Sequence, residues 1–497
     1  MNLATIIDSH PGDATALISR GRATDYDTLR GQVAALRGAF VGAGLQPGER
    51  LAIVAGNNRY FVVSYLAALG AGLVVVPLNS TNPPAAMAHE LRESGAVAIV
   101  AGPTARATLG DIDWSTVPDV RYFVGAGFEP GPLGELFDDL LTHEPAPVVD
   151  RDPDDVAVLI FTSGTAGAPR PAMLTHGNLY TNIRQVLASD VQIQEPGDVV
   201  FGLLPLFHIF GLNVVLGVAL TVGASILLIE RFDPISAIES IVKHGVTNVS
   251  GPPTMWAAFA GLPGLTGNEL STVRRAVSGA AKLPTEVAQA IRNRFGLELD
   301  EGYGLTEASP VVTAPIAGVT PQGSVGIPVP GVSVRLIDAS GDDVLVGDPG
   351  EVIVQGPNVF AGYWNDPEAT ARVLSTDGWL HTGDIGVVDD AGNLYLVDRA
   401  KDLIIVSGFN VFPAEVEEVL LQHPAVEGCA VVGVAHPHTG ESVKAYVKVL
   451  DGMPIEEDDV VDFCAERLPH YKCPNKVWFV EDIPRGLGGK VIRRLLD

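Results

Sequence analysis

A run of small and hydroxylated residues at positions 161–170 carries the clearest chemical signal in this sequence. It reads Phe-Thr-Ser-Gly-Thr-Ala-Gly-Ala-Pro-Arg and follows an apolar stretch, 156–160, that predicts a buried strand. Glycines let the backbone approach a phosphate, amides and hydroxyls donate hydrogen bonds to it, and a cation neutralises its charge. The run lacks the Gly-Lys-Ser/Thr ending of P-loop enzymes. It therefore predicts a phosphate-binding loop of another type, although taken alone the run would be interpreted more safely as a flexible turn.

Four further motifs of nucleotide-site type follow in order along the chain. Residues 278–284 form a small-residue loop able to admit a flat base, and residues 302–307 combine an aromatic ring, a hydroxyl and a carboxylate. Residues 378–384 place an acid after a tight turn, and residues 484–490 end in a lysine on a glycine-rich loop. This series makes a mere turn at 161–170 the weaker interpretation.

In this order, the five motifs resemble those of the adenylate-forming enzymes: acyl-CoA synthetases, luciferases and nonribosomal adenylation domains. The resemblance covers nearly the whole chain, and residues 301–312, 362–364, 381–385 and 406–413 are most similar to bacterial fatty-acyl-CoA ligases. Such enzymes join a carboxylate to the α-phosphate of ATP, release pyrophosphate, and let a thiol displace AMP. The resemblance implies ATP, Mg²⁺ and coenzyme A, with a small-molecule carboxylic acid as the other substrate.

The resemblance also implies which residues contact the nucleotide. They are Thr162, Ser163, Gly164, Gly167, Arg170, Gly279, Ala280, Ala281, Gly302, Tyr303, Gly304, Leu305, Thr306, Asp384 and Arg399. The loop residues among them would cradle the β- and γ-phosphates, and residues 279–281 with Tyr303 would enclose the adenine. Asp384 would accept from the ribose hydroxyls, since an ionised carboxylate only accepts hydrogen bonds. A local Asx turn is the alternative for Asp384.

The resemblance gives catalytic roles to Lys490, Glu307, Thr165 and His208. Glu307 and Thr165 would hold Mg²⁺, a hard cation that prefers oxygen ligands, and Lys490 would lie across the reacting carboxylate and the α-phosphate. Alternatives are a helix cap for Glu307 and a solvated surface lysine for Lys490. Lys401 occupies the hinge position, about which the C-terminal domain would swing between the two half-reactions.

Two further groups of residues complete the expected site. Ser407, Gly408, Phe409 and Lys472 are expected to bind coenzyme A. His208, Met255, Trp256 and Ser278 are expected to line the acyl pocket. A buried, hydrogen-bonded histidine is the alternative for His208, and packing in the core is an equally good interpretation of Met255 and Trp256.

The chain departs from the family pattern in the first motif. Arg170-Pro171 stands where Lys-Gly is usual, and Ala166 replaces a frequent threonine. Arginine keeps the charge but is planar and bulkier, and proline removes an amide and fixes φ. We therefore expect a weaker grip on phosphate.

Four functional interpretations follow. The leading one is a ligase for medium- or long-chain fatty acids, and the second is a ligase for aromatic or other small acids. The third is an acyl-AMP ligase serving a carrier protein, although such relatives are generally longer, and the fourth is a weakened adenylate-binding protein.

The elements that position these motifs are predicted to form an α/β fold. Short Val/Ile/Leu runs at 51–54, 73–77, 97–101, 225–229 and 247–249 alternate with helical segments such as 26–43 and 84–94. Such runs are typical of parallel strands buried on both faces. We expect a large N-terminal domain, 1–397, of layered sub-sheets plus a small antiparallel β subdomain, a hinge at 398–402, and a small mobile α+β domain, 403–497.

Composition narrows the surroundings of the protein. A net charge of −27 argues against nucleic acid as a partner. Three cysteines without metal-like spacing and no secretory signal predict a cytoplasmic protein. The run 199–228 lacks Asp, Glu, Lys and Arg, but Pro205 and several glycines interrupt it, so it predicts strand, loop, buried helix and strand instead of a membrane span. Peripheral membrane contact and a homodimer stay open.

The swinging-domain hypothesis predicts a split between the half-reactions for Lys490→Ala. Formation of acyl-AMP from ATP should fall about 10²- to 10³-fold, because one charge-stabilising donor is lost. Transfer of supplied acyl-AMP to coenzyme A should persist, measured as thioester formed without ATP. Equal loss of both steps would contradict the hypothesis.

Overall fold

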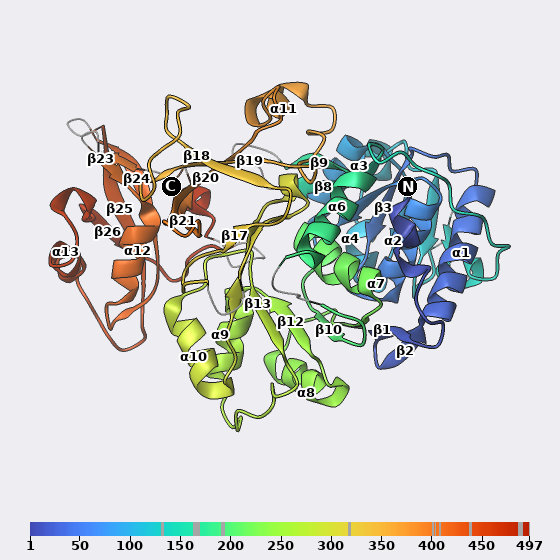
Figure 1. The fold of residues 1–497 in the computed structure, drawn as a ribbon, viewed down its shortest axis with the longest axis horizontal. Coiled ribbons are helices and arrows are strands. Elements are labelled where there is room, and N and C mark those ends of the chain that lie inside the picture. Colours follow the sequence, from blue (N-terminus) through green and yellow to red (C-terminus); the bar gives the residue numbers. More distant parts are fainter. Residues whose placement is uncertain are drawn as a thin grey trace.

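The fold was obtained as a computed structural model. The structure describes residues 1–130, 134–162, 169–189, 194–316, 320–399, 402, 404–406, 409–436, 440–485 and 491–496. Two seven-stranded sheets form the bulk of the N-terminal part, as the apolar runs predicted, and the C-terminal part lies at one end of the molecule in Figure 1.

The first sheet has the order β7-β6-β5-β3-β4-β8-β9 and is parallel except for β9. Its strands are β3 Arg50–Val54, β4 Val74–Leu78, β5 Ala96–Ala101, β6 Tyr122–Gly125, β7 Gly134–Leu136, β8 Val156–Thr162 and β9 Arg170–Thr175. The accompanying helices are α1 Tyr26–Gly42, α2 Arg59–Gly70, α3 Pro84–Ser94, α4 Arg106–Gly110, α5 Phe137–Leu140 and α6 His176–Leu187. The central strands are almost fully buried, which explains their continuous apolar character.

The second sheet has the order β14-β13-β12-β10-β11-β1-β2, parallel except for the β1–β2 pair. Its strands are β1 Thr15–Ser19, β2 Arg22–Asp25, β10 Val199–Gly202, β11 Ser225–Leu228, β12 Asn248–Gly251, β13 Arg275–Ser278 and β14 Asp300–Glu301. Its helices are η4 Phe210–Gly217, α7 Val218–Val222, α8 Pro234–His244, α9 Pro253–Gly261 and α10 Thr285–Phe295.

The charge-free run at 199–228 forms β10, a loop, the π-helix η4 followed by α7, and β11, as predicted. Residues of η4 are buried, and the side chain of Asn213 donates to the carbonyls of Leu179 and Ser309 at 3.1 and 2.7 Å. The run lacks charges because it lies inside the protein. Within the described ranges, no helix is both long and apolar enough for a membrane span.

Two small antiparallel sheets follow, and the second of them, which lies after residue 330, agrees with the predicted change of pattern. One contains β15 Tyr303–Gly304, β16 Val311–Ala314 and β17 Ile327–Pro328, and a 3₁₀ turn, η5 Thr306–Ala308, separates β15 from β16. The other contains β18 Ser333–Ile337, β19 Gly350–Gln355, β20 Leu380–Val388 and β21 Leu394–Arg399, with α11 Pro367–Val373 between β19 and β20.

The C-terminal part has its own sheet and core. The sheet order is β23-β22-β25-β24, and β26 pairs with β25. Its elements are β22 Ile404–Val406, β23 Phe409–Val411, α12 Pro413–Leu421, β24 Val426–His436, β25 Gly440–Val449, α13 Glu457–Ala465, β26 Lys476–Phe479 and the 3₁₀ turn η8 Arg493–Leu495. All three cysteines are buried there as free thiols. The proposed boundary at 398–402 begins at the end of β21, just before this sheet.

Arg493 anchors the segment that follows the lysine loop. Its guanidinium bonds both carboxylate oxygens of Glu417 on α12 at 2.8 and 3.0 Å, Asp402 at 3.0 Å and the carbonyl of Val431 at 3.0 Å. The three charged side chains are only 15–18% exposed. Removing one member of a sheltered ion network leaves the others without compensation.

We therefore expect Arg493→Ala to destabilise the C-terminal domain by about 2–3 kcal/mol. The measurement is the first unfolding transition in urea. Arg467→Ala, which removes an exposed pair with Glu466, is the control and should change stability by less than about 1 kcal/mol. Equal effects of the two substitutions would show that the Arg493 network contributes little.

Candidate active site

The carboxyl ends of four neighbouring strands gather most of the predicted site. Strands β10, β12, β13 and β14 lie side by side in parallel, so the loops that follow them meet at one edge of the second sheet. Ligands of open α/β sheets bind at this edge. The loops there carry His208, residues 279–281 and Tyr303, which the sequence had assigned to one site.

A buried tyrosine–carboxylate pair forms the predicted ribose corner. The Tyr303 hydroxyl donates to Asp384 Oδ2 at 2.7 Å, and Tyr303 and Asp384 are 6% and 9% exposed. The Thr382 hydroxyl accepts from the Asp384 amide at 3.1 Å and donates to the Val352 carbonyl at 2.7 Å. Arg399 lies opposite Asp384 in the β20–β21 ladder. The pair therefore joins β15 to β20 and holds the Asp384 carboxylate in place.

The predicted adenine loop is conformationally constrained. Ala280 has φ +70°, a left-handed conformation that costs free energy for a residue with a side chain. A Cβ at Gly279 would lie 2.6 Å from the Phe210 ring, so any larger residue at position 279 would require that ring to move. Gly304 is equally restricted, because a Cβ there would meet the Pro310 carbonyl oxygen at 2.2 Å.

The remaining predicted site residues of the 278–284 and 302–307 motifs lie close by in the chain. Gly302, Leu305 and Thr306 are partly buried, and Ala281 is partly buried at the end of the adenine loop.

A second tyrosine–carboxylate pair holds the predicted metal ligand. The Tyr363 hydroxyl donates to Glu307 Oε1 at 2.7 Å, and the Glu307 carbonyl accepts from the Phe360 amide at 2.8 Å. Burial, together with the neighbouring Glu307 carboxylate, raises the pKa of Tyr363, so the phenol stays protonated and donates. Glu307 lies within η5, and its carboxylate is held by Tyr363, 56 residues away.

The donor set fits a magnesium ion that arrives with a nucleotide. Among the described residues no three His, Cys, Asp or Glu side chains converge as a metal cage. Mg²⁺ is commonly bound by one or two carboxylates together with substrate phosphates and water. Glu307 would supply the carboxylate and ATP the phosphate oxygens.

The phosphate loop is bounded by Thr162 and Arg170, which face each other at the ends of β8 and β9. The Thr162 hydroxyl is buried and has no partner among the described residues. Arg170 Nε pairs with Asp366 Oδ2 at 2.9 Å. Five residues of the predicted phosphate loop lie outside the described residues: Ser163, Gly164, Thr165, Ala166 and Gly167.

The predicted acyl residues separate into two environments. His208 is exposed to solvent, yet desolvation by the surrounding protein lowers its pKa. Its Nδ1 accepts from the Phe210 amide at 3.2 Å. Trp256 is fully buried and donates to the Val277 carbonyl at 3.2 Å, which places it in the core beneath β13.

Of the other two predicted acyl residues, Met255 lies in the first turn of α9 and Ser278 at the end of β13. Met255 is 1% exposed and packs against Gly251, where an added Cβ would meet its Cε at 2.3 Å. Ser278 ends β13, and its hydroxyl is buried without a partner among the described residues.

The predicted coenzyme A residues are less complete. Lys472 Nζ contacts both carboxylate oxygens of Glu415 at 2.6 Å, and its side chain is 16% exposed. It is therefore committed to an ion pair within the C-terminal domain. Phe409 begins β23, whereas Ser407, Gly408, the hinge residue Lys401 and the catalytic candidate Lys490 lie outside the described residues.

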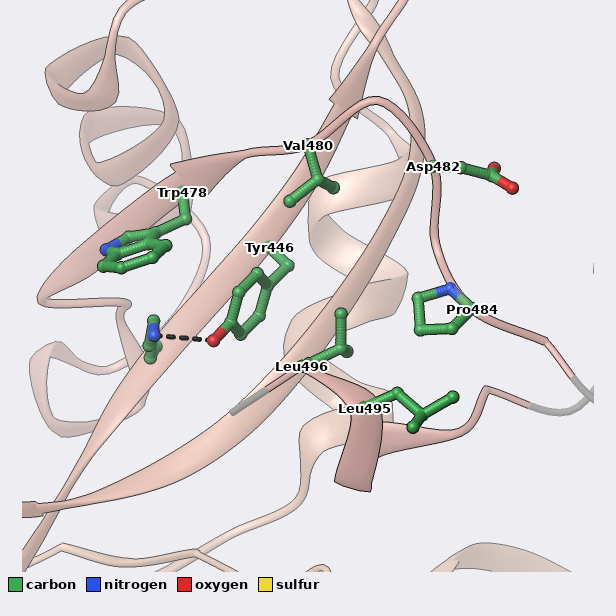
Figure 2. A pocket seen from close by; sticks show the side chains of 8 residues that line it. Tyr446, Trp478, Val480, Asp482, Pro484, Leu495 and Leu496 are labelled. Atoms are coloured by element: carbon green, nitrogen blue, oxygen red, sulfur yellow. Dashed lines mark hydrogen bonds between the residues drawn. The ribbon is translucent and has the colours of Figure 1, made fainter.

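The C-terminal domain also carries an open groove of about 680 Å³ that involves none of the predicted site residues (Figure 2). It is lined by Lys444, Tyr446, Trp478, Val480, Asp482, Pro484, Leu495 and Leu496. The Lys444 ammonium donates to the Tyr446 hydroxyl at 2.6 Å and lies 3.9 Å from the Trp478 ring centroid. Its lining includes Pro484 and Leu495, which flank the lysine loop on either side.

Sequence reasoning missed three residues that shape the site: Phe210, Tyr363 and Asp366. The 362–364 turn had been noticed only as part of a resemblance, without a role for the tyrosine. Tyr363 contacts Glu307, which is 56 residues away along the chain, and Phe210 contacts Gly279, which is 69 residues away. Asp366 contacts Arg170, which is 196 residues away. No local pattern signals such contacts.

Comparison with known proteins identifies the family. A family model described as "AMP-binding enzyme" matches residues 4–364, and one described as "AMP-binding enzyme C-terminal domain" matches residues 415–490. A feruloyl-CoA synthase of an Amycolatopsis species is 38% identical over 97% of this chain and 94% of its own length. A long-chain-fatty-acid–CoA ligase of Bacillus subtilis is 34% identical over 97% of this chain and 91% of its own.

A solved structure extends this result to three dimensions. ATP-bound MatB from Rhodopseudomonas palustris superposes with a TM-score of 0.91 at 32% identity, covering 100% of this chain and 98% of that one. The fold of this chain thus matches that of a solved ATP-bound protein along its whole length. The chain is a member of the AMP-binding, adenylate-forming enzyme family and an AMP-forming acid–thiol ligase.

Proposed function

We propose that this ligase converts a planar aromatic carboxylic acid, of the hydroxycinnamate type, into its coenzyme A thioester through an acyl-AMP intermediate. The observation that carries the choice of acid is that Phe210 packs on Gly279, which follows the predicted acyl residue Ser278 and begins the adenine loop, and that Met255 packs on Gly251. The name of the feruloyl-CoA synthase relative agrees with this choice.

The described residues support the nucleotide half of the proposal. Asp384, held by Tyr303, would accept from ribose hydroxyls, and Glu307, held by Tyr363, would contact a phosphate-bound cation. When bound, Mg²⁺ offsets the phosphate charge that otherwise repels the incoming carboxylate. Lys490 would serve the adenylation step, and the C-terminal domain would turn about Lys401 between the steps.

The acyl side favours a short, flat substrate for steric reasons. Both glycines stand at the ends of adjacent strands, and in each case the space next to the backbone is filled by a neighbouring side chain. A planar ring can slide along the glycine backbone, whereas a long alkyl chain needs a tunnel beyond it. His208 at the open wall offers a polar ring edge to a substrate carboxylate or hydroxyl.

A fatty acid is the second candidate, and Met255 is the observation that favours it. Methionine is unbranched and flexible, so its displacement would open the space beside Gly251. The Bacillus relative named for long-chain fatty acids is nearly as similar to this chain as the feruloyl relative.

A panel of acids tests the proposal, with pyrophosphate release and thioester formation measured separately. We expect kcat/KM for ferulate to exceed that for decanoate and palmitate by at least about tenfold, because misfit to a closed pocket costs about 1–3 kcal/mol. Met255→Ala should reduce this preference by enlarging the pocket. A preference for palmitate in the unaltered enzyme would favour the second candidate. Pyrophosphate without thioester would indicate an acyl-AMP ligase, and neither product an adenylate-binding protein.

A further inference from the structure

Residues 361–370, called the brace here, pair with the strand that follows the phosphate loop. The amide of Ala361 donates to the Met173 carbonyl at 3.0 Å, and the Met173 amide donates to the Gly362 carbonyl at 2.9 Å. The amide of Trp364 donates to the Pro171 carbonyl at 2.8 Å. The start of the brace therefore extends the first sheet along the outer edge of β9.

The turn inside the brace is held by tight packing. Gly362 has φ +118°, and a Cβ there would lie 2.8 and 2.9 Å from Thr370 Cγ2 and Oγ1. The Thr370 hydroxyl accepts from the Tyr363 amide at 2.9 Å and donates to the Asp366 carbonyl at 2.9 Å. The Phe360 ring, 2% exposed, packs edge-on against the Tyr363 ring at 5.0 Å. The positions of Tyr363 and Asp366 are therefore fixed relative to β9.

From this turn, two side chains reach two different parts of the site. Tyr363 holds Glu307 by one carboxylate oxygen, and Asp366 holds Arg170 at the first position of β9. Asp366 also caps α11, since its Oδ1 accepts from the Ala369 amide at 2.9 Å. The brace thus connects two residues through one rigid turn: Glu307, the predicted metal ligand, and Arg170, at the end of the predicted phosphate loop.

We propose that the brace sets the positions of Glu307 and Arg170 for Mg²⁺-ATP, with Tyr363 and Asp366 as its positioning residues. Tyr363 orients the Glu307 carboxylate towards the cation by occupying Oε1. Arg170 acts through Asp366, as an anchor of β9 to α11, and contributes little direct contact to phosphate. This inference rests on the proposed ATP-dependent function.

The brace also accounts for Pro171. Met173 exchanges both of its backbone hydrogen bonds with the brace, and the Pro171 carbonyl points to the same side. Successive residues of a strand form their backbone hydrogen bonds on opposite sides, so residues 171 and 173 bond on the same side. An amide at position 171 would therefore face the brace and not β8. Proline at this position therefore leaves the β8–β9 pairing intact. The sequence suggested that loss of the amide at position 171 would weaken phosphate binding. That amide would lie on the edge of β9 that faces away from β8.

Tyr363→Phe tests the positioning of Glu307 by Tyr363 through ATP binding alone. We expect the Kd for ATP with Mg²⁺, measured by calorimetry, to rise about tenfold, since a hydrogen bond to a charged group is worth about 1.5–3 kcal/mol. The Kd for ATP in EDTA should not change. Tyr122→Phe, which removes a phenol–carboxylate bond to Glu135 remote from the site, is the matched control. An unchanged Kd with Mg²⁺, or equal weakening with and without Mg²⁺, would overturn this role.

A double-mutant cycle tests whether Arg170 acts through Asp366. Asp366→Asn keeps the cap oxygen for Ala369 but removes the charge, and Arg170→Gln removes the cation. If Arg170 works through Asp366, each single change and the double change should all raise the Kd for Mg²⁺-ATP by about the same factor, roughly fivefold. Additive effects of about 25-fold, or no effect of Asp366→Asn, would show that Arg170 contacts phosphate independently.

Failure of the proposed function and failure of this inference give different results. If the unaltered protein binds no Mg²⁺-ATP, the proposed function fails. If it binds Mg²⁺-ATP and the variants behave as the unaltered protein does, only the brace is refuted.

Discussion

Repulsion between anions is the constraint around which this enzyme is arranged. An acid must approach a triphosphate on a protein whose own net charge is −27. The two carboxylates of the site, Asp384 and Glu307, are each held by a neutral phenol. A phenol fixes a carboxylate without cancelling the negative charge that a ribose or a magnesium ion requires. Asp366 already pairs with Arg170, so in the proposed function the extra positive charge would come chiefly from Mg²⁺ and Lys490.

The two tyrosine–carboxylate pairs also explain how separate sheets form one site. Tyr303 and Asp384 connect the small sheet after β14 to the β18–β21 sheet, and Tyr363 and Glu307 connect η5 to the brace on β9. Each bond is between groups that are costly to bury without a partner. The energetic requirement to satisfy these groups thus aligns elements that the backbone alone leaves independent.

Substrate choice depends on different physics from nucleotide binding. The nucleotide is held by charges and hydrogen bonds that any member of the family needs. In the proposed function the acid would be selected by volume, and the two glycines with the side chains that cover them, Phe210 and Met255, would define that volume. This difference explains why relatives with similar identity to this chain bear names for aromatic and for fatty acids.

Local patterns in the sequence were sufficient for the family, the α/β class, the two large sub-sheets and the small antiparallel sheet. Buried parallel strands require continuous apolar runs, and a phosphate loop requires glycines and hydroxyls, so both leave a mark on neighbouring residues. The burial of the 199–228 run was also predictable, since the glycines and the proline that interrupt it are visible in the chain. The association of Asp384 with the residues around Tyr303 followed from the resemblance.

Tertiary structure alone decided how those residues are used. Arg170 is predicted to contact phosphate from its place in the motif, and the motif gives no sign of its pair with Asp366, 196 residues away. Trp256 appeared equally suited to a pocket or the core, and its bond to Val277 shows that it is in the core. Lys472, which is predicted to bind coenzyme A, pairs with Glu415, and nothing in the sequence indicated that pair. A charged or aromatic side chain has several acceptable environments, and the choice between them depends on contacts formed only when distant segments pack together.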